Sequence, residues 1–107
     1  MTAEIGQFAQ NSKNIHFWDP LVSDGSTPAV RLFGTNFTFV DKIVGSNITT
    51  VHEGSLNGTD WFILETHSHT GSGIDHHTYS NKPVLYVRAT ASSIGAGESY
   101  HGSVMCD

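Results

Sequence analysis

Four of the seven histidines of this 107-residue chain fall in one short polar stretch, between Thr66 and Lys82. They are His67, His69, His76 and His77, and Tyr79 follows them closely. Because side chains two residues apart on an extended chain point the same way, His67 and His69 are predicted to face one site. Two imidazoles on one side of a chain are suited to bind a metal ion such as Zn²⁺. Metal binding at His67 and His69 is therefore the first chemistry that the sequence suggests.

The stretch itself is predicted to be a long surface loop, because His, Thr, Ser and Gly dominate it. Loops of this length usually have a functional or an interfacial role. We therefore expect an interface loop that touches a neighbouring protein through His67, His69, His76, His77 and Tyr79.

The residues around these histidines depart from two enzyme families that use a His-x-His motif. Metallo-β-lactamase-like hydrolases carry His-x-His-x-Asp-His, whereas Thr70-Gly71-Ser72 follows His69 here. Cupins place a glutamate a few residues after the motif, whereas the next acidic residue here is Asp75. Since the chain also has no Gly-x-Ser-x-Gly elbow, we expect no enzyme, no catalytic residue and no cofactor beyond a metal ion. The alternative is a metal-dependent enzyme that uses His67 and His69 with His76 or His77.

Two apolar segments flank the histidine-rich stretch and must position it. In the first, two β-rich runs are joined by Asn57-Gly58, a pair that predicts a tight type I′ turn because both residues tolerate positive φ. The run after this turn, residues 61–64, is apolar on both faces, which is typical of a central strand. The second segment, residues 83–90, reads as a strand with a single cation, Arg88. The candidate acidic partners of Arg88 are Glu53, Asp60 and Glu65.

The whole chain reads as short strands separated by turns, with no amphipathic helical pattern. We therefore predict an all-β fold, a jelly-roll-like, single-domain β-sandwich of about seven or eight antiparallel strands over residues 15–107. Residues 1–14 are predicted to form an N-terminal arm or edge segment. The strand aromatics are expected in the core rather than on a sugar-binding platform; these are Trp18, Trp61, Tyr79 and Tyr86.

Charge composition narrows the classes of partner. Ten acidic residues against five Lys and Arg give a formal net charge of -5, so direct binding to nucleic acid is not expected. No apolar run approaches the length of a membrane span and no signal peptide is visible, so we expect no membrane partner and synthesis in the cytoplasm. Because only 14% of residues are charged, we expect a surface that contacts other protein chains.

Two central segments carry a resemblance to a known class of proteins. They are Glu53-Gly54-Ser55-Leu56-Asn57-Gly58-Thr59-Asp60-Trp61 and Pro83-Val84-Leu85-Tyr86-Val87-Arg88-Ala89-Thr90. This pattern resembles one found in small virion structural proteins of tailed bacteriophages. The Trp-bearing turn is also similar to one in discoidin-type carbohydrate-binding sandwiches, which leaves a carbohydrate-binding module as an alternative.

The phage resemblance implies a protein located in the virion and synthesised in the host cytoplasm. It implies a capsid decoration (cement) protein that binds the major capsid protein or other virion proteins, with a neck or tail component as the alternative. A homo-oligomer is implied, with a trimer favoured, because phage tail fibres use His-x-His motifs to bind iron on a trimer axis. In that case His67 and His69 would lie on the axis of the oligomer.

Overall fold

The computed structural model describes residues 14–106, which form nine β-strands and no helix. No helix that could span a membrane occurs in this part of the chain. Of the predicted arm, residues 1–13 lie outside the described residues, and Asn14 is the first residue of a strand. The strands are β1 (Asn14–Phe17), β2 (Gly25–Ser26), β3 (Val30–Arg31), β4 (Phe37–Val44), β5 (Ile48–Ser55), β6 (Phe62–His69), β7 (Gly73–Tyr79), β8 (Tyr86–Ser92) and β9 (Ser99–Cys106).

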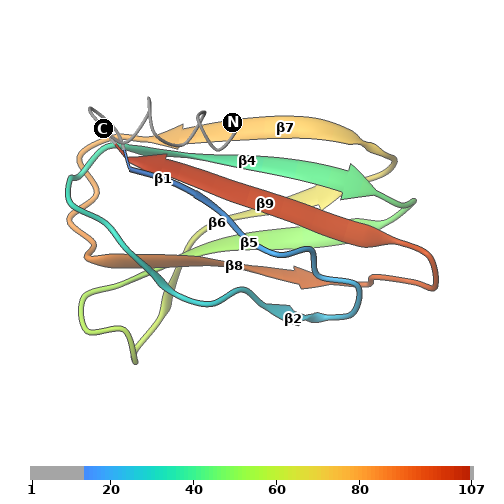
Figure 1. Ribbon diagram of the computed structural model, residues 1–107, viewed down its shortest axis with the longest axis horizontal. Helices are drawn as coiled ribbons and strands as arrows, with labels where there is room; N and C mark the ends of the chain where they lie inside the picture. Colours follow the sequence, from blue (N-terminus) through green and yellow to red (C-terminus); the bar gives the residue numbers. More distant parts are fainter. Residues whose placement is uncertain (1–13, 107) are drawn as a thin grey trace, which may run out of the picture.

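The strands form two antiparallel sheets, so the predicted β-sandwich is confirmed (Figure 1). One sheet has the order β1-β9-β4-β7, and the other has the order β2-β8-β5-β6, with β3 also paired to β8. The first strand therefore pairs with the last, and the pairing continues inward to the β5–β6 hairpin at the centre of the sequence. A long hairpin rolled up in this way is a jelly roll, as the sequence predicts.

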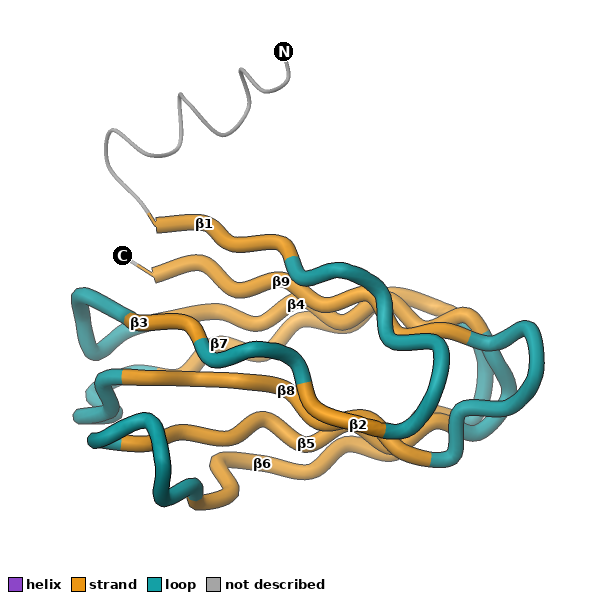
Figure 2. The backbone as a smooth tube through the Cα atoms, turned by 60° about the horizontal axis from the view of Figure 1, so that its bottom comes forward, coloured by secondary structure: helices purple, strands orange, loops and turns teal. Residues whose placement is uncertain are grey.

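The strand count exceeds the expected seven or eight because one strand position is split. β2 and β3 have two residues each and both pair with β8, and the intervening residues 27–29 follow the course of the same edge (Figure 2). Pro28 lies in this gap and has no backbone N–H to donate to a neighbouring strand. The edge strand is therefore interrupted at Pro28.

The core fills the space between the two sheets. Phe37, Phe39 and Ile43 of β4 alternate with more exposed residues, as a strand with one buried face requires. Val87, Ala89 and Ala91 of β8 alternate in the same way from the other sheet. Two of the four aromatics expected in the core are buried, Trp18 and Tyr79, whereas Trp61 and Tyr86 are only partly buried.

The predicted type I′ turn is wrong. β5 ends at Ser55 and β6 begins at Phe62, so residues 56–61 form a wider loop in which Gly58 has a φ of 79° and Asn57 has no positive φ. The side chain of Asn57 shapes this loop instead, because its Oδ1 accepts hydrogen bonds from the backbone N–H groups of Thr59 and Asp60, both at 2.8 Å. An Asn side chain commonly replaces a backbone acceptor in this manner.

The prediction that residues 61–64 belong to a central strand is also wrong, because β6 is the edge strand of its sheet. A bulge explains the apolar residues on both faces. Gly54 lies opposite Phe62 and His52 lies opposite Glu65, so β6 contains one residue more than β5, and Leu64 has no partner in the register. This extra residue turns Glu65 and His67 toward the interior of the sandwich.

Arg88 pairs with one of its three candidate partners. Its Nε donates a hydrogen bond to Oε1 of Glu53 at 2.6 Å, and its guanidinium lies over the ring of Trp61, 4.3 Å from the centroid. One face of Trp61 is therefore occupied by a cation and is closed to a sugar ring.

Candidate functional site

No backbone pairing joins the two sheets where the edge strands β6 and β7 run along one side of the sandwich. We call this side the β6/β7 edge. Turn residues 70–72 connect the two strands, so they run antiparallel in different sheets. The inward side chains are Glu65, His67 and His69 from β6 and Asp75, His77 and Tyr79 from β7.

These six side chains meet in three pairs across the edge. The hydroxyl of Tyr79 donates to Oε1 of Glu65 at 3.0 Å. The rings of His67 and His77 stack with their centroids 3.6 Å apart, and Nδ1 of His69 lies 3.4 Å from Oδ2 of Asp75. A polar ladder thus fills a place that apolar side chains occupy elsewhere in the core.

The predicted interface loop is therefore wrong as a structural element, because most of it belongs to β6 and β7. Four of its five named residues, His67, His69, His77 and Tyr79, face inward, and only His76 is exposed. The prediction of a loop failed for a physical reason: at this edge the inner face of the strands is polar, and the outer face carries Ile74, which is 69% exposed. This arrangement reverses the polarity by which a half-buried strand is normally recognised.

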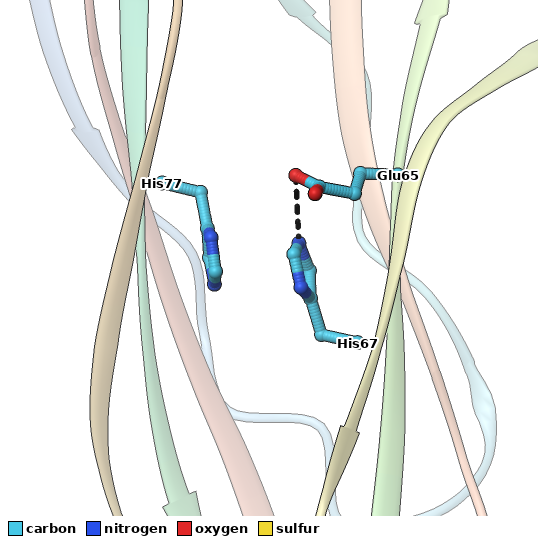
Figure 3. A group of neighbouring side chains, drawn as sticks. All are labelled: Glu65, His67 and His77. Carbon is cyan, nitrogen blue, oxygen red and sulfur yellow. Dashed lines mark ion pairs between the residues drawn. The ribbon is translucent and has the colours of Figure 1, made fainter.

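The metal pair expected from the sequence, His67 with His69, is replaced by a different group. One ligand atom each from Glu65, His67 and His77 lies within 4.8 Å of the others (Figure 3). His69 is held apart from this group, since its Nε2 lies 3.0 Å from Oγ1 of Thr50. Both histidines are partly buried on the inner side of β6. Their placement on an oligomer axis stays a prediction.

One ring nitrogen of each histidine in the stacked pair lacks a hydrogen-bond partner. Nε2 of His67 and Nε2 of His77 are buried and have no hydrogen-bond partner among the described residues. Nε2 of His67 lies 3.2 Å from Oε1 of Glu65, within ion-pair distance but without the geometry of a hydrogen bond. Buried polar atoms without a partner cost about 1–3 kcal/mol each, so they are uncommon in folded proteins.

Next to this pair lies a cluster that the sequence gave no reason to expect, made of Asp41, His52, Tyr79 and Tyr100. Asp41 and His52 are fully buried. Nε2 of His52 lies 2.7 Å from Oδ2 of Asp41, and Nδ1 of His52 lies 2.7 Å from the hydroxyl of Tyr79. The Tyr100 hydroxyl donates to Oδ1 of Asp41 at 2.6 Å. We call these four residues the buried cluster.

The hydrogen bonds of the buried cluster form one connected chain from Glu65 to Asp41. Because the Tyr79 hydroxyl donates to Glu65, Nδ1 of His52 has to donate to the Tyr79 oxygen. Nε2 of His52 donates to the carboxylate of Asp41. Asp41 and His52 thus form a buried pair of a carboxyl group and an imidazole. Such a pair needs further hydrogen bonds to be tolerated in the interior, and Tyr79 and Tyr100 supply them.

The pKa values of the acidic groups agree with this arrangement. Burial by itself would raise the pKa of Asp41, but the hydrogen bond and charge of His52 and the hydrogen bond of Tyr100 together lower it. The pKa of Glu65 is lowered chiefly by the hydrogen bond from Tyr79. Burial, followed by the nearby carboxylates, raises the pKa values of Tyr79 and Tyr100, so both remain hydroxyl donors.

The pKa of His67 is also lowered, which favours the neutral form of its ring. Burial is the main cause that lowers the pKa of His67, and the charges of His77 and His52 add to it. A neutral imidazole keeps a lone pair for a metal ion or for a hydrogen-bond donor. His67 is therefore suited to act as a ligand.

A histidine paired with an aspartate can also be the general base of an enzyme. His52 does not meet the geometric requirement for that role, because it is fully buried and both of its ring nitrogens are occupied. At the β6/β7 edge, the groups that can serve together as metal ligands are Glu65, His67 and His77.

The chain matches no protein-family model and no curated protein sequence. Among solved structures it is similar to the SPBc2 prophage-derived protein YomS, with a TM-score of 0.62 and 12% identity over 88% of this chain and 93% of that chain. PirA has a TM-score of 0.49 and 9% identity over 86% of this chain and 90% of that chain. A chain of the disulfide-linked pili that form Bacillus endospore appendages has a TM-score of 0.42 and 13% identity, with 88% of both chains covered. At these identities the likeness to YomS shows a shared fold.

Proposed function

We propose that this protein is a structural component of a phage virion, and specifically a capsid decoration protein that stabilises the head through contacts with other protein chains. The observation that carries the proposal is the set of large apolar side chains left exposed on the sandwich. Phe33 is 73% exposed, Val22 is 70% exposed and Ile63 is 62% exposed. Apolar surface of this kind on a small domain commonly marks a protein contact.

Part of this apolar surface gathers at one end of the sandwich. The loops of residues 32–36, 56–61 and 80–85 lie at the same end (Figures 1 and 2). Phe33 and Leu85 line one groove there, and Leu56 is exposed on the neighbouring loop. The fold shared with a prophage-derived protein and the low charged fraction, 14% of residues, agree with a role in assembly.

The test is quantitative mass spectrometry of particles purified from a phage or induced lysogen that carries the gene. A decoration protein is expected in a fixed ratio to the major capsid protein, on the order of one copy per capsid subunit or per capsomer. A few copies per particle would instead indicate a neck or tail component. Absence of the peptides from particles, with the protein recovered from the host cytosol, would refute the virion role.

A matched pair of variants tests the apolar contact itself. Phe33→Ser removes an exposed ring from the groove, and Phe17→Ser removes a comparably exposed ring, at 67%, from β1 outside it. If the groove docks on the head, only Phe33→Ser is expected to reduce incorporation into particles. The homo-oligomer belongs to this proposal, and the trimer remains a prediction to be checked by light scattering of the purified chain.

A further inference from the structure

We propose that Glu65, His67 and His77 bind one divalent transition-metal ion, with Zn²⁺ as the ion that best fits the ligands, and that this ion joins the two sheets at the β6/β7 edge. This inference goes beyond the virion role and does not depend on it. It concerns a purified chain, so its failure would leave the proposed function untouched.

The donor set is the first argument. Two imidazole nitrogens and one carboxylate oxygen are a common set of protein ligands for Zn²⁺, with bonds of about 2.0–2.2 Å. The three ligand atoms already lie within 4.8 Å of one another. Bonds of that length hold neighbouring ligand atoms about 3.3 Å apart. To close the site, the half-exposed Glu65 side chain and the two stacked rings would have to turn toward one ion.

The unsatisfied nitrogens are the second argument, and they are independent of the first. Nε2 of His67 and Nε2 of His77 are buried without a partner, although His52 beside them uses both of its nitrogens. A metal ion accepts a lone pair from each ring and so provides the missing interaction.

The third argument is the support behind the carboxylate. Oε1 of Glu65 accepts a hydrogen bond from Tyr79, whose hydroxyl is in turn bonded to His52, which is paired with Asp41. Hydrogen bonds of this kind orient metal-binding carboxylates and affect affinity. Glu65 is thus connected to the rigid core, while half of its side chain remains open to solvent. Water can occupy the remaining coordination position.

The position of the three ligands in two different sheets would give the ion a structural role. Glu65 and His67 belong to one sheet and His77 belongs to the other, and no backbone pairing links β6 to β7. An ion held by all three residues would connect the sheets at this edge. Metal binding then stabilises the folded chain, because the unfolded chain does not hold these ligands together.

The experiment is calorimetric titration of the untagged, chelator-treated chain with Zn²⁺. We expect one ion per chain and a rise of the thermal midpoint on binding. His77→Gln and Glu65→Gln are each expected to weaken binding at least about tenfold. The matched controls are His76→Gln, on the outer face of β7, and His69→Gln, which belonged to the pair expected from the sequence; neither should change the affinity.

A measurement on the unaltered chain avoids dependence on the folding of variants. Zn²⁺ is expected to shift the imidazole NMR signals of His67 and His77 and to leave those of His69 and His76 in place. Absence of binding in a titration with an excess of Zn²⁺ would overturn the proposal. Binding that His69→Gln or His76→Gln abolishes while His77→Gln leaves it intact would overturn it as well.

Discussion

Two neighbouring places in this molecule hold buried histidines that differ in the hydrogen-bond partners of their ring nitrogens. His52 lies in the buried cluster, where Asp41 and Tyr79 occupy both of its ring nitrogens. His67 and His77 lie about one ring away, with centroids 5.0 and 5.6 Å from that of His52, and their Nε2 atoms have no partner. The comparison shows that the hydrogen-bond partners of a buried histidine, and not its residue type, decide whether its ring nitrogens are already occupied or remain free to bind a ligand.

The same substitution in both places should give the largest contrast. His52→Phe leaves the carboxylate of Asp41 buried without its imidazole partner, so we expect a loss of about 3–5 kcal/mol in the free energy of unfolding. His77→Phe removes a polar atom that has no partner, so we expect a change of less than about 1 kcal/mol in the presence of a chelator. Denaturant unfolding measures both values. Equal losses would show that the two histidines are not in different states.

Within the buried cluster, the hydroxyl of Tyr100 can be removed without changing the charges. Tyr100→Phe deletes a donor to the ionised Asp41, and we expect a loss of about 1.5–3 kcal/mol, as for hydrogen bonds to charged groups. Tyr86→Phe is the control, because Tyr86 lies partly exposed at the start of β8. A Tyr100→Phe variant as stable as the unaltered protein would mean that Asp41 does not depend on this bond.

The two regions should also lose stability in different pH ranges. The pKa of His67 is lowered by burial in the folded chain, so the unfolded chain takes up protons first as the pH falls below the ordinary value of 6.5. The free energy of unfolding should decrease in that range, and less so in His67→Phe. The pKa of Asp41 is lowered from 3.8, so its contribution is present at higher pH and is lost below about pH 4. Unfolding curves from pH 8 to pH 3 test both ranges; an unchanged slope near pH 6 in His67→Phe would contradict the first.

The smallest effect is expected at the ion pair of Arg88 and Glu53, which is partly exposed, at 28% and 16%. Arg88→Lys keeps the charge but loses the planar group that lies over Trp61 and donates to Glu53. We expect a loss of about 0.5–1 kcal/mol, reduced by salt, since solvent screens such pairs. A loss as large as that of Tyr100→Phe would show that this outer pair is as important as the buried cluster.

Much of the fold could be predicted from the sequence, because strand propensity and turn residues are local properties. The all-β class and the jelly-roll character follow from short runs of Val, Ile, Phe and Thr between Gly-, Asn- and Pro-rich turns. That His67 and His69 point the same way was also predictable, since alternation along an extended chain needs no tertiary information. The bulge at Leu64 could not be predicted, because an extra residue in one strand is recognised only when its pairing with the neighbouring strand is known.

The candidate site depended on pairing across the sandwich. The position of His77 opposite His67 follows from two strands in different sheets that meet at one edge, and no local pattern records which strands do so. A sequence signal did exist: Glu65, His67 and His69 lie seven, five and three positions before Ser72, and Tyr79, His77 and Asp75 lie seven, five and three positions after it. This symmetric spacing can be recognised as a pairing only once residues 62–69 and 73–79 are known to be strands.

The sequence by itself thus determined the antiparallel jelly roll and the shared direction of His67 and His69 along their segment. Only the tertiary structure decided that Asp41, His52 and Tyr100 meet in the core, since they come from β4, β5 and β9. It also decided that His67 faces His77 and Glu65 rather than acting with His69. The physical reason is that strand alternation is set by the local backbone, whereas hydrogen-bond and ligand partners are set by packing between distant segments.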